Sequence, residues 1–358
     1  MRSVFFLVVF VISSLQVFSQ IDSLEIKVGQ MIMVGMPGTS VNDNSSILKE
    51  IKKGHIGGIL LYEYNLNPIQ TKANLSKLTS SLQEAAPISL LISIDQEGGQ
   101  VNRLKTKYGF KPMPSAKSIG DKNRDEYTDS VGTIIASALM NCGINLNYAP
   151  VLDLHNPVCP VLGKRQRCYS SNPDRVAHHA ALTIEAHHNQ GVKTVVKHFP
   201  GHGNSLADSH LGMADVTKVW KKIELKPYQL LIGEGVVDAV MTAHIVNRKL
   251  DSTSLPATLS KQIVTGILRN ELGFNGVVIS DDMQMHAISS YYGFEESIKK
   301  CINAGVDILM FSNNIKGATN YEPANIHATI LRLVKSGEIS IDRINESYQR
   351  IMSMKRTR

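Results

Sequence analysis

Residues 194–203 read Thr194-Val195-Val196-Lys197-His198-Phe199-Pro200-Gly201-His202-Gly203, and they show the pattern on which the fold prediction rests. The β-branched run before Lys197 predicts a buried strand that ends in two polar side chains, Lys197 and His198. Pro200 and the two glycines interrupt regular structure, so a bent loop should follow this strand. The loop continues to Asp208 and His210, which adds two ionisable groups. A glycine- and proline-rich turn with incidental histidines is the alternative explanation.

The same unit, an apolar strand followed by an amphipathic helix, recurs along the chain. We expect eight strands, at residues 31–35, 56–62, 89–95, 146–151, 194–199, 239–244, 276–281 and 306–311. Helical patterns lie between them, for example at residues 174–190, 260–272 and 295–304. Strands that are apolar on both faces and alternate with helices indicate a parallel sheet covered by helices, and eight units favour a closed (β/α)8 TIM-type barrel. An open doubly wound sheet is the alternative, but no glycine-rich phosphate-binding fingerprint follows any strand.

The chain of 358 residues is organised as one domain after a short leader. Residues 1–19 combine the positive Arg2, a short apolar run and a small-residue cleavage site, which predicts a secretory signal peptide. The apolar run is too short for a comfortable membrane span, so we expect no stable membrane insertion after its removal. Export to the periplasm or out of the cell follows, with a retained anchor as the alternative. Residues 20–358 then form a single catalytic barrel that ends in a closing helix, and we expect a monomer.

Composition and cysteine content narrow the class of protein further. The formal net charge is +7, but the basic residues are scattered and aromatic residues make up only 6%, which argues against a nucleic-acid partner. Cys159 and Cys168 share one predicted loop and could form a disulfide, while Cys142 and Cys301 lie in apolar helical contexts typical of core thiols. No cysteine pair has the close spacing of a zinc site.

Polar side chains follow most of the predicted strands, where a barrel places its active site. They are Asp95, Glu97 and Arg103 after the third strand, Asp153, Arg165 and Arg167 after the fourth, Lys197 and His198 at the fifth, His244 at the sixth, and Asp281 and Asp282 at the seventh. Asp153 and Asp282 are equally consistent with helix caps, and Glu97 is expected to be a buried structural acid. The predicted helix at 174–190 carries a separate group, expected to lie on the surface or in helix packing: His178, His179, His187 and His188.

Three kinds of chemistry suit these strand ends. Glycoside hydrolysis needs a proton donor and a carboxylate, and charged side chains would hold the sugar hydroxyls. A metal-dependent hydrolase could use His198, His202, His210 or His244 with an aspartate, although the chain has no HExxH motif. A sugar-binding protein without turnover is the third possibility.

Several strings in the chain resemble a known enzyme family. IDQEGGQVNR, NLNYAPVLDL, VKHFPGHG followed by DSH, MTAH, LPATLS and GVVISDDM occur in this order. Together they resemble glycoside hydrolase family 3, and within it the single-barrel bacterial β-N-acetylglucosaminidases of the NagZ type. The resemblance spans nearly all of the chain after the leader, and KHFPGHG with DSH is its most specific part. It implies a (β/α)8 barrel, a small-molecule carbohydrate substrate, and no metal or organic cofactor.

The resemblance also implies roles for individual residues. Asp281 matches the nucleophile, which would form a covalent glycosyl-enzyme and retain the anomeric configuration. His210 matches the acid/base with Asp208 as its partner, and a histidine suits proton transfer in both directions near neutral pH. The positions that match sugar contacts are Asp95, Arg103, Arg167, Lys197 and His198, with Arg167 preferred to Arg165. His202 then becomes a structural residue of the loop.

The chain departs from the family pattern at a few positions, but no departure removes a residue with a chemical role. Asn204-Ser205 replaces the usual Asp-Thr pair after GHG, and Asn172 replaces the aspartate before Pro173. The resulting expectation is an exported, retaining exo-β-N-acetylglucosaminidase that acts on peptidoglycan fragments or chitooligosaccharides. Another β-glycosidase activity of the family, or phosphorolysis with phosphate in place of water, stays open at this stage.

Overall fold

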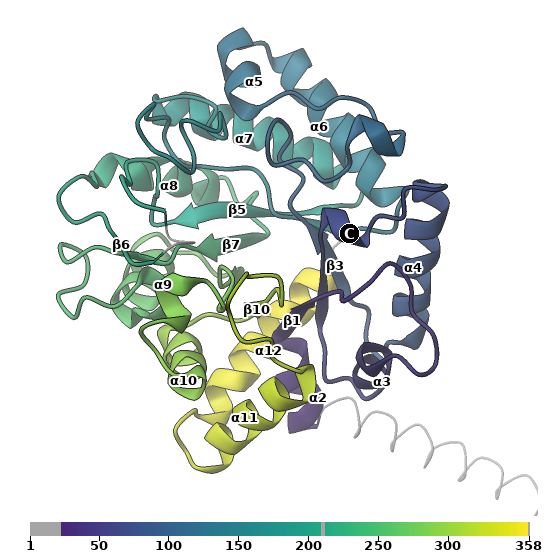
Figure 1. The fold of residues 1–358 in the computed structure, drawn as a ribbon. Helices are drawn as coiled ribbons and strands as arrows, with labels where there is room; N and C mark the ends of the chain where they lie inside the picture. Colours follow the sequence, from purple (N-terminus) through teal and green to yellow (C-terminus); the bar gives the residue numbers. More distant parts are fainter. Residues whose placement is uncertain (1–22, 209–211, 357–358) are drawn as a thin grey trace, which may run out of the picture.

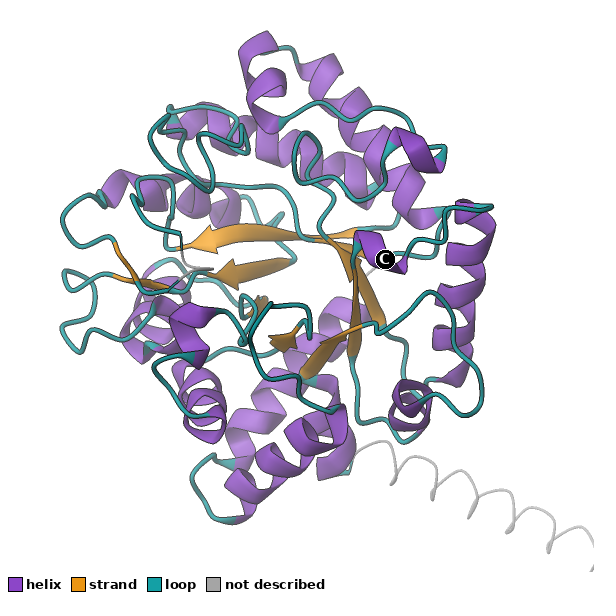
Figure 2. Ribbon diagram, viewed as in Figure 1, coloured by secondary structure: helices purple, strands orange, loops and turns teal. Residues whose placement is uncertain are grey.

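The protein forms a parallel β-barrel surrounded by helices (Figures 1 and 2). A computed structural model describes residues 23–208 and 212–356. Its main sheet has eight strands in the order β10-β1-β2-β3-β4-β5-β7-β9. The two outer strands in this order also meet, because Ile279 forms a parallel bridge to Ile308 and Ser280 N donates to Ile308 O across 2.9 Å. The predicted (β/α)8 barrel is therefore confirmed.

The strands of the barrel occupy the positions expected from the sequence, although each except β5 is shorter than the apolar run that predicted it. They are β1 (Ile32–Gly35), β2 (Gly58–Leu61), β3 (Leu91–Ile94), β4 (Leu146–Asn147), β5 (Lys193–Phe199), β7 (Ala239–Thr242), β9 (Val277–Ile279) and β10 (Leu309–Phe311). A second, two-stranded sheet pairs β6 (Ala214–Asp215) with β8 (Ile245–Val246). Strand β4 ends four residues before its predicted end at Val151, where Pro150 cannot donate a ladder hydrogen bond. Only an isolated bridge from Val151 to Lys197 continues the pairing.

Helices cover the outside of the barrel, and their apolar faces form one core with the strands (Figure 2). The α-helices are α2 (Leu24–Gln30), α3 (Ser46–Lys52), α4 (Thr71–Ala85), α5 (Ala116–Lys122), α6 (Asp125–Met140), α7 (Pro173–His188), α8 (Lys226–Gly233), α9 (His286–Ser289), α10 (Phe294–Ala304), α11 (Pro323–Lys335) and α12 (Ile341–Arg356). Short 3₁₀ turns are η1 (Glu63–Asn65), η2 (Thr106–Tyr108), η3 (Lys222–Leu225) and η4 (Ala257–Leu259). The helix predicted at 260–272 is present as η5 (Gln262–Glu271), but it has the wider π-helical hydrogen bonding.

The carboxylate of Asp307, just before β10, links the barrel strand β9 to the outer helices through hydrogen bonds. It is fully buried and accepts hydrogen bonds from Val278 N at 2.9 Å and from the guanidinium groups of Arg269, Arg343 and Arg350. Arg343 and Arg350 belong to α12, so this one carboxylate joins β9, η5 and the last helix. Burying a carboxylate is costly unless charged donors surround it, and here three surround it.

All four cysteines are free and buried. Cys142 and Cys301 are buried core thiols, as expected. Cys159 and Cys168 do not form the disulfide that their shared loop allowed; both are free thiols, buried with Val151, Val161 and Leu162 in a small apolar cluster.

The predicted signal peptide at residues 1–19 lies outside the described residues. Within residues 23–208 and 212–356, no helix is long and apolar enough to span a bilayer.

Candidate active site

Charged side chains follow the carboxyl ends of several barrel strands, and some of them contact one another. The Lys197 ammonium lies 2.6 Å from Asp95 Oδ1 and 2.7 Å from Glu97 Oε1. Lys197 is only 2% exposed, so both carboxylates hold it without competition from solvent. Arg103 approaches the other oxygen of Asp95 at 3.8 Å. Three of the predicted sugar-binding residues, Asp95, Arg103 and Lys197, are thus brought together.

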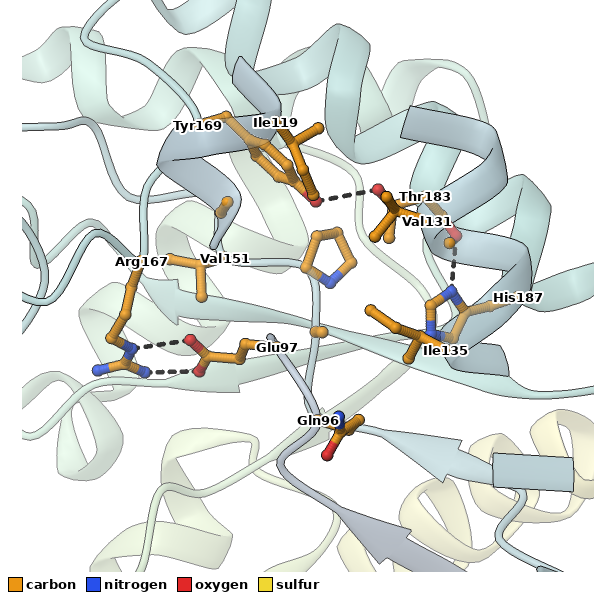
Figure 3. Close-up of a pocket in the computed structure, with 14 residues that line it drawn as sticks. Gln96, Glu97, Ile119, Val131, Ile135, Val151, Arg167, Tyr169, Thr183 and His187 are labelled. Atoms are coloured by element: carbon orange, nitrogen blue, oxygen red, sulfur yellow. Dashed lines mark hydrogen bonds and ion pairs between the residues drawn. The ribbon is translucent and has the colours of Figure 1, made fainter. Parts of the chain in front are cut away.

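Glu97 is a buried anchor, as the sequence suggested, and Arg167 is its main partner (Figure 3). Arg167 Nε donates to Glu97 Oε2 at 2.8 Å and Nη2 donates to Oε1 at 2.7 Å, which is a bidentate pair. Burial opposes ionisation, but Arg167 and Lys197 outweigh it and hold the pKa of the Glu97 carboxyl well below its usual value. Arg165 is exposed, whereas Arg167 is held against Glu97.

His198 is held in one orientation by Asp153, which the sequence left between a helix cap and a site residue. His198 Nδ1 donates to Asp153 Oδ2 at 2.6 Å, and the backbone N–H groups of His198 and His202 donate to the same carboxylate. Arg167 Nη2 faces His198 Nε2 at 3.4 Å. Burial opposes ionisation of Asp153, but His198 and His202 bring its pKa below the usual value. Asp153 is therefore a positioning residue of the site and not a helix cap.

A break in strand regularity explains how both Lys197 and His198 reach the site. Neighbouring residues of a regular strand point to opposite faces. The register between β5 and β7 shifts between Val196 and Phe199. Lys197 and His198 lie inside this irregular interval, so their side chains need not point to opposite faces. Both side chains are consequently buried among the charged groups of the site.

Asp281 follows β9 and is half-buried, and its Oδ1 accepts the backbone N–H of Asp282 at 2.8 Å. Asp282 turns inward to Ser312 instead, and burial raises its pKa to about 6. Tyr148, which follows β4, is fully buried, and its hydroxyl lies 3.1 Å from Ser93 Oγ. Burial raises the pKa of its hydroxyl, and the nearby charges of both Asp95 and Asp281 act in the same direction. Asp281 follows β9 and Asp95 follows β3, so both lie at the carboxyl ends of parallel barrel strands.

The loop after β5 is tied down at its base. Trp220 Nε1 donates to Pro200 O at 3.0 Å, and Asn204 Nδ2 donates to the buried carboxylate of Glu224 at 2.9 Å. Asn156 in turn donates to Asn204 Oδ1 at 2.9 Å, so the residue that departs from the family pattern links two neighbouring segments. Asp208 is the last described residue before the gap and is half-buried. His210, the predicted acid/base, lies outside the described residues.

A buried polar network that the sequence did not reveal joins α7, β4 and the segment after β3. His187 Nε2 on α7 contacts Asn147 Nδ2 at 3.0 Å, and the Asn147 amide bonds both backbone groups of Gln96. Gln96 Oε1 accepts the backbone N–H groups of Arg103 and Leu104. Burial lowers the pKa of His187 to about 4, so this imidazole is neutral at pH 7. The network fixes the segment that carries Asp95, Glu97 and Arg103.

His244 and three histidines of α7 have structural partners. His244 contacts Thr258 Oγ1 and the backbone oxygen of Asp282. On α7, His178 and His188 pair with Asp125 and Asp238 near the surface, and His179 packs in the interior beside Thr128, which agrees with the surface-or-packing prediction. Burial lowers the pKa of His202 to about 4. Among residues 23–208 and 212–356, no group of three or more His, Cys, Asp or Glu side chains could hold a metal ion.

Comparison with known proteins agrees with this geometry. Residues 23–354 match the model of the glycosyl hydrolase family 3 N terminal domain. A β-hexosaminidase from Tolumonas auensis is 37% identical over 269 residues, which cover 74% of this chain and 77% of that protein. The structure of a glycoside hydrolase family 3 β-N-acetylglucosaminidase from a Paenibacillus species has a TM-score of 0.84 at 37% identity, covering 93% of this chain and 62% of that one.

A second solved structure matches this chain over nearly its whole length. It is a β-N-acetylhexosaminidase from Beutenbergia cavernae, with a TM-score of 0.83 at 27% identity, covering 94% of this chain and 99% of that one. The chain therefore belongs to glycosyl hydrolase family 3 and is a glycoside hydrolase of the β-N-acetylhexosaminidase type.

Proposed function

We propose that the protein is a retaining exo-β-N-acetylglucosaminidase that removes terminal β-linked N-acetylglucosamine through a covalent intermediate on Asp281. The observation that supports this most is that Asp281 and the Asp95–Lys197 group both lie at the carboxyl ends of parallel barrel strands, where a barrel enzyme places its active site. A carboxylate that faces a cluster of fixed charged hydrogen-bonding groups can attack an anomeric carbon while the cluster holds the sugar hydroxyls. Arg103, Arg167 and His198 complete the proposed sugar contacts.

The proposed reaction has two steps that share one acid/base. In the first, the Asp281 carboxylate bonds to the anomeric carbon, the glycosidic C–O bond breaks, and the His210 imidazolium gives its proton to the leaving oxygen. In the second, neutral His210 takes a proton from water, the water oxygen bonds to the anomeric carbon, and the bond to Asp281 breaks. Asp208 fixes the histidine tautomer and stabilises the imidazolium. Two inversions leave the product in the β configuration.

The test is the configuration of the first product. Proton NMR during early hydrolysis of p-nitrophenyl N-acetyl-β-glucosaminide should show the β anomer of N-acetylglucosamine before mutarotation. The α anomer would contradict the covalent step, and an intact substrate would favour a binding protein without turnover. Full activity in EDTA is expected, whereas complete loss would favour a metal-dependent hydrolase. If N-acetylglucosamine 1-phosphate forms when phosphate is added, the protein is a phosphorylase and not a hydrolase.

We also propose that the protein is exported after removal of residues 1–19. Amino-terminal sequencing of the mature protein from the extracytoplasmic fraction should begin at or near Gln20. A mature protein that keeps Met1 and sediments with membranes would instead indicate a retained anchor.

A further inference from the structure

His187 belongs to a helix that covers the barrel, yet its ring is bonded to a barrel strand. The side chain lies in the last turn of α7 and is fully buried. Its Nδ1 is 2.8 Å from Thr183 O, one turn earlier on the same helix (Figure 3). Its Nε2 is 3.0 Å from Asn147 Nδ2, at the end of β4. The two ring nitrogens therefore have two different kinds of partner.

These partners allow a single arrangement of protons on the ring. A carbonyl oxygen can only accept, so Nδ1 must carry the proton that is donated to Thr183 O. An amide nitrogen can only donate, so Nε2 must be the unprotonated acceptor of the bond from Asn147. Burial is the main reason that the pKa of His187 falls to about 4, so the neutral form that this arrangement needs is present at pH 7.

The orientation of the Asn147 amide is set from its other side by Gln96. Asn147 Oδ1 accepts the backbone N–H of Gln96 at 3.0 Å, and Nδ2 donates to Gln96 O at 3.1 Å. A flipped amide would place two donors together at one of these contacts and two acceptors together at the other. Both hydrogens of Nδ2 are thus in use, one on Gln96 and one on His187. Without the ring acceptor, a buried donor would lose its partner.

Gln96 connects this amide to the residues proposed to hold the sugar. It directly follows Asp95, whose carboxylate lies 2.6 Å from the Lys197 ammonium. The Gln96 side chain is buried, and its Oε1 accepts the backbone N–H of Arg103 at 2.9 Å. The backbone on both sides of the sugar-binding segment therefore depends on one residue, which is bonded in turn to the Asn147 amide.

We propose that His187 is a positioning residue for sugar binding and that only its neutral Nδ1–H form has this role. It acts through Asn147 and Gln96, and the groups whose positions it sets are Asp95 and Arg103. The inference rests on the proposed sugar contacts and deepens them, because it adds a residue of a covering helix that need not touch the sugar.

The first experiment removes the acceptor and then restores it. His187→Leu keeps a buried apolar side chain but cannot accept from Asn147, so KM for p-nitrophenyl N-acetyl-β-glucosaminide should rise roughly tenfold while kcat changes by less than about twofold. His187→Gln offers an amide oxygen as the acceptor, so its KM should stay within about twofold of the wild-type value.

The matched control is His188→Leu, the same substitution at the next residue of α7. The His188 ring lies 2.6 Å from Asp238 and does not belong to the network, so the control should leave KM unchanged even if it lowers stability. An unchanged KM in His187→Leu, or an equal rise of KM in His187→Leu and His188→Leu, would overturn the positioning role.

The second experiment uses the wild-type protein and does not depend on whether His187→Leu folds. NMR of protein with isotope-labelled histidine, with the His187 signals identified by their loss in His187→Gln, should show the neutral Nδ1–H tautomer at pH 7. The Nε2 signal should shift when N-acetylglucosamine is added. A charged ring or an Nε2–H tautomer would overturn the proposed form, and an Nε2 signal that does not respond to saturating sugar would overturn the link to binding.

The wild-type reaction separates failure of this inference from failure of the proposed function. If the wild type does not cleave the p-nitrophenyl substrate, the proposed function is wrong, and calorimetric Kd values for N-acetylglucosamine then replace KM in the comparison of variants. Weaker binding to His187→Leu than to His187→Gln would support the positioning role. Equal binding to the two variants, or no binding to any of the proteins, would overturn it.

Discussion

His198 Nδ1 lies 2.6 Å from Asp153 Oδ2, and the same carboxylate also receives the backbone N–H of His202 through its other oxygen. This single buried group therefore sets both the tautomer of His198 and the path of the chain beyond β5. With Nδ1 carrying the proton, the Nε2 lone pair of His198 faces Arg167. The position of a proposed sugar contact is thus decided by a residue that need not touch the sugar.

Asp153→Asn should weaken substrate binding more than it slows the chemical step. The amide can still accept a backbone hydrogen bond, but it no longer stabilises the protonated Nδ1, so His198 can rotate or change tautomer. Because a hydrogen bond to a charged group contributes about 1.5–3 kcal/mol, KM should rise roughly 10- to 100-fold. Steady-state kinetics with p-nitrophenyl N-acetyl-β-glucosaminide would measure KM and kcat for the variant and the wild type. A fall in kcat alone, with KM unchanged, would contradict the positioning role.

Lys197→Met should strongly destabilise the fold as well as the site. Removing the buried ammonium leaves Asp95 and Glu97 with fewer compensating charges, and breaking a buried pair costs about 3–5 kcal/mol. Urea unfolding at pH 7 would give the difference in the free energy of unfolding. Lys117→Met is the matched control, because Lys117 forms an exposed i,i+4 pair with Asp121 and should lose no more than about 1 kcal/mol. Similar losses in the two variants would show that the Lys197 cluster contributes little to stability.

The sequence predicted the barrel well because its signal is local. Each strand is apolar on both faces, and its polar end residues are visible in the chain itself. Side-chain partners across the barrel could not be predicted in this way, because Asp153 and His198 are 45 positions apart and meet only when β4 and β5 pair. Helical periodicity likewise placed His187 on α7, but the periodicity could not predict that His187 contacts Asn147. The sequence also missed the early end of β4 at Asn147, because the apolar run continues to Val151. Pro150 within that run cannot donate a ladder hydrogen bond.

Asp281→Ala should almost abolish turnover while preserving the fold. If Asp281 is the nucleophile, the shortened side chain leaves room for a small anion beside the anomeric carbon. Added sodium azide should then restore part of the activity on an activated substrate and give the α-glycosyl azide, because only one inversion occurs. NMR of the azide product gives its configuration. Asp282→Asn, at the neighbouring carboxylate, should show no azide rescue. A β-configured azide product from Asp281→Ala would show that another residue is the nucleophile.

His210→Ala should discriminate between leaving groups. A residue that protonates the leaving oxygen matters little for p-nitrophenolate, which leaves without help, but it contributes about 10²- to 10⁴-fold for a sugar alcohol. The ratio of kcat/KM values for the p-nitrophenyl substrate and chitobiose should therefore rise by at least an order of magnitude in the variant. Unchanged selectivity between the two substrates would rule out proton donation by His210.

Glu224→Gln should change how stability depends on pH, because burial raises the pKa of this carboxyl to about 7. Its ordinary value is 4.5, so between pH 4.5 and 7 the unfolded chain loses the proton while the folded protein keeps it. The free energy of unfolding of the wild type should consequently fall across this window, by roughly 3 kcal/mol at most. Glutamine can still accept from Asn204 and does not titrate, so this component should vanish in the variant.

The measurement is urea unfolding of both proteins from pH 4 to 8. The stability of Glu224→Gln relative to the wild type should increase as pH rises from 4.5 to 7 and stay constant above it. Glu63→Gln is a control with the opposite sign. Slight burial opposes ionisation of Glu63, but Lys105 and Lys107 lower its pKa to about 2. Replacing the Glu63 carboxylate should therefore lower the free energy of unfolding mainly above pH 4. If the stability difference between Glu224→Gln and the wild type does not change between pH 4.5 and 7, the Glu224 carboxyl is ionised across this range and accepts the Asn204 hydrogen bond as an anion.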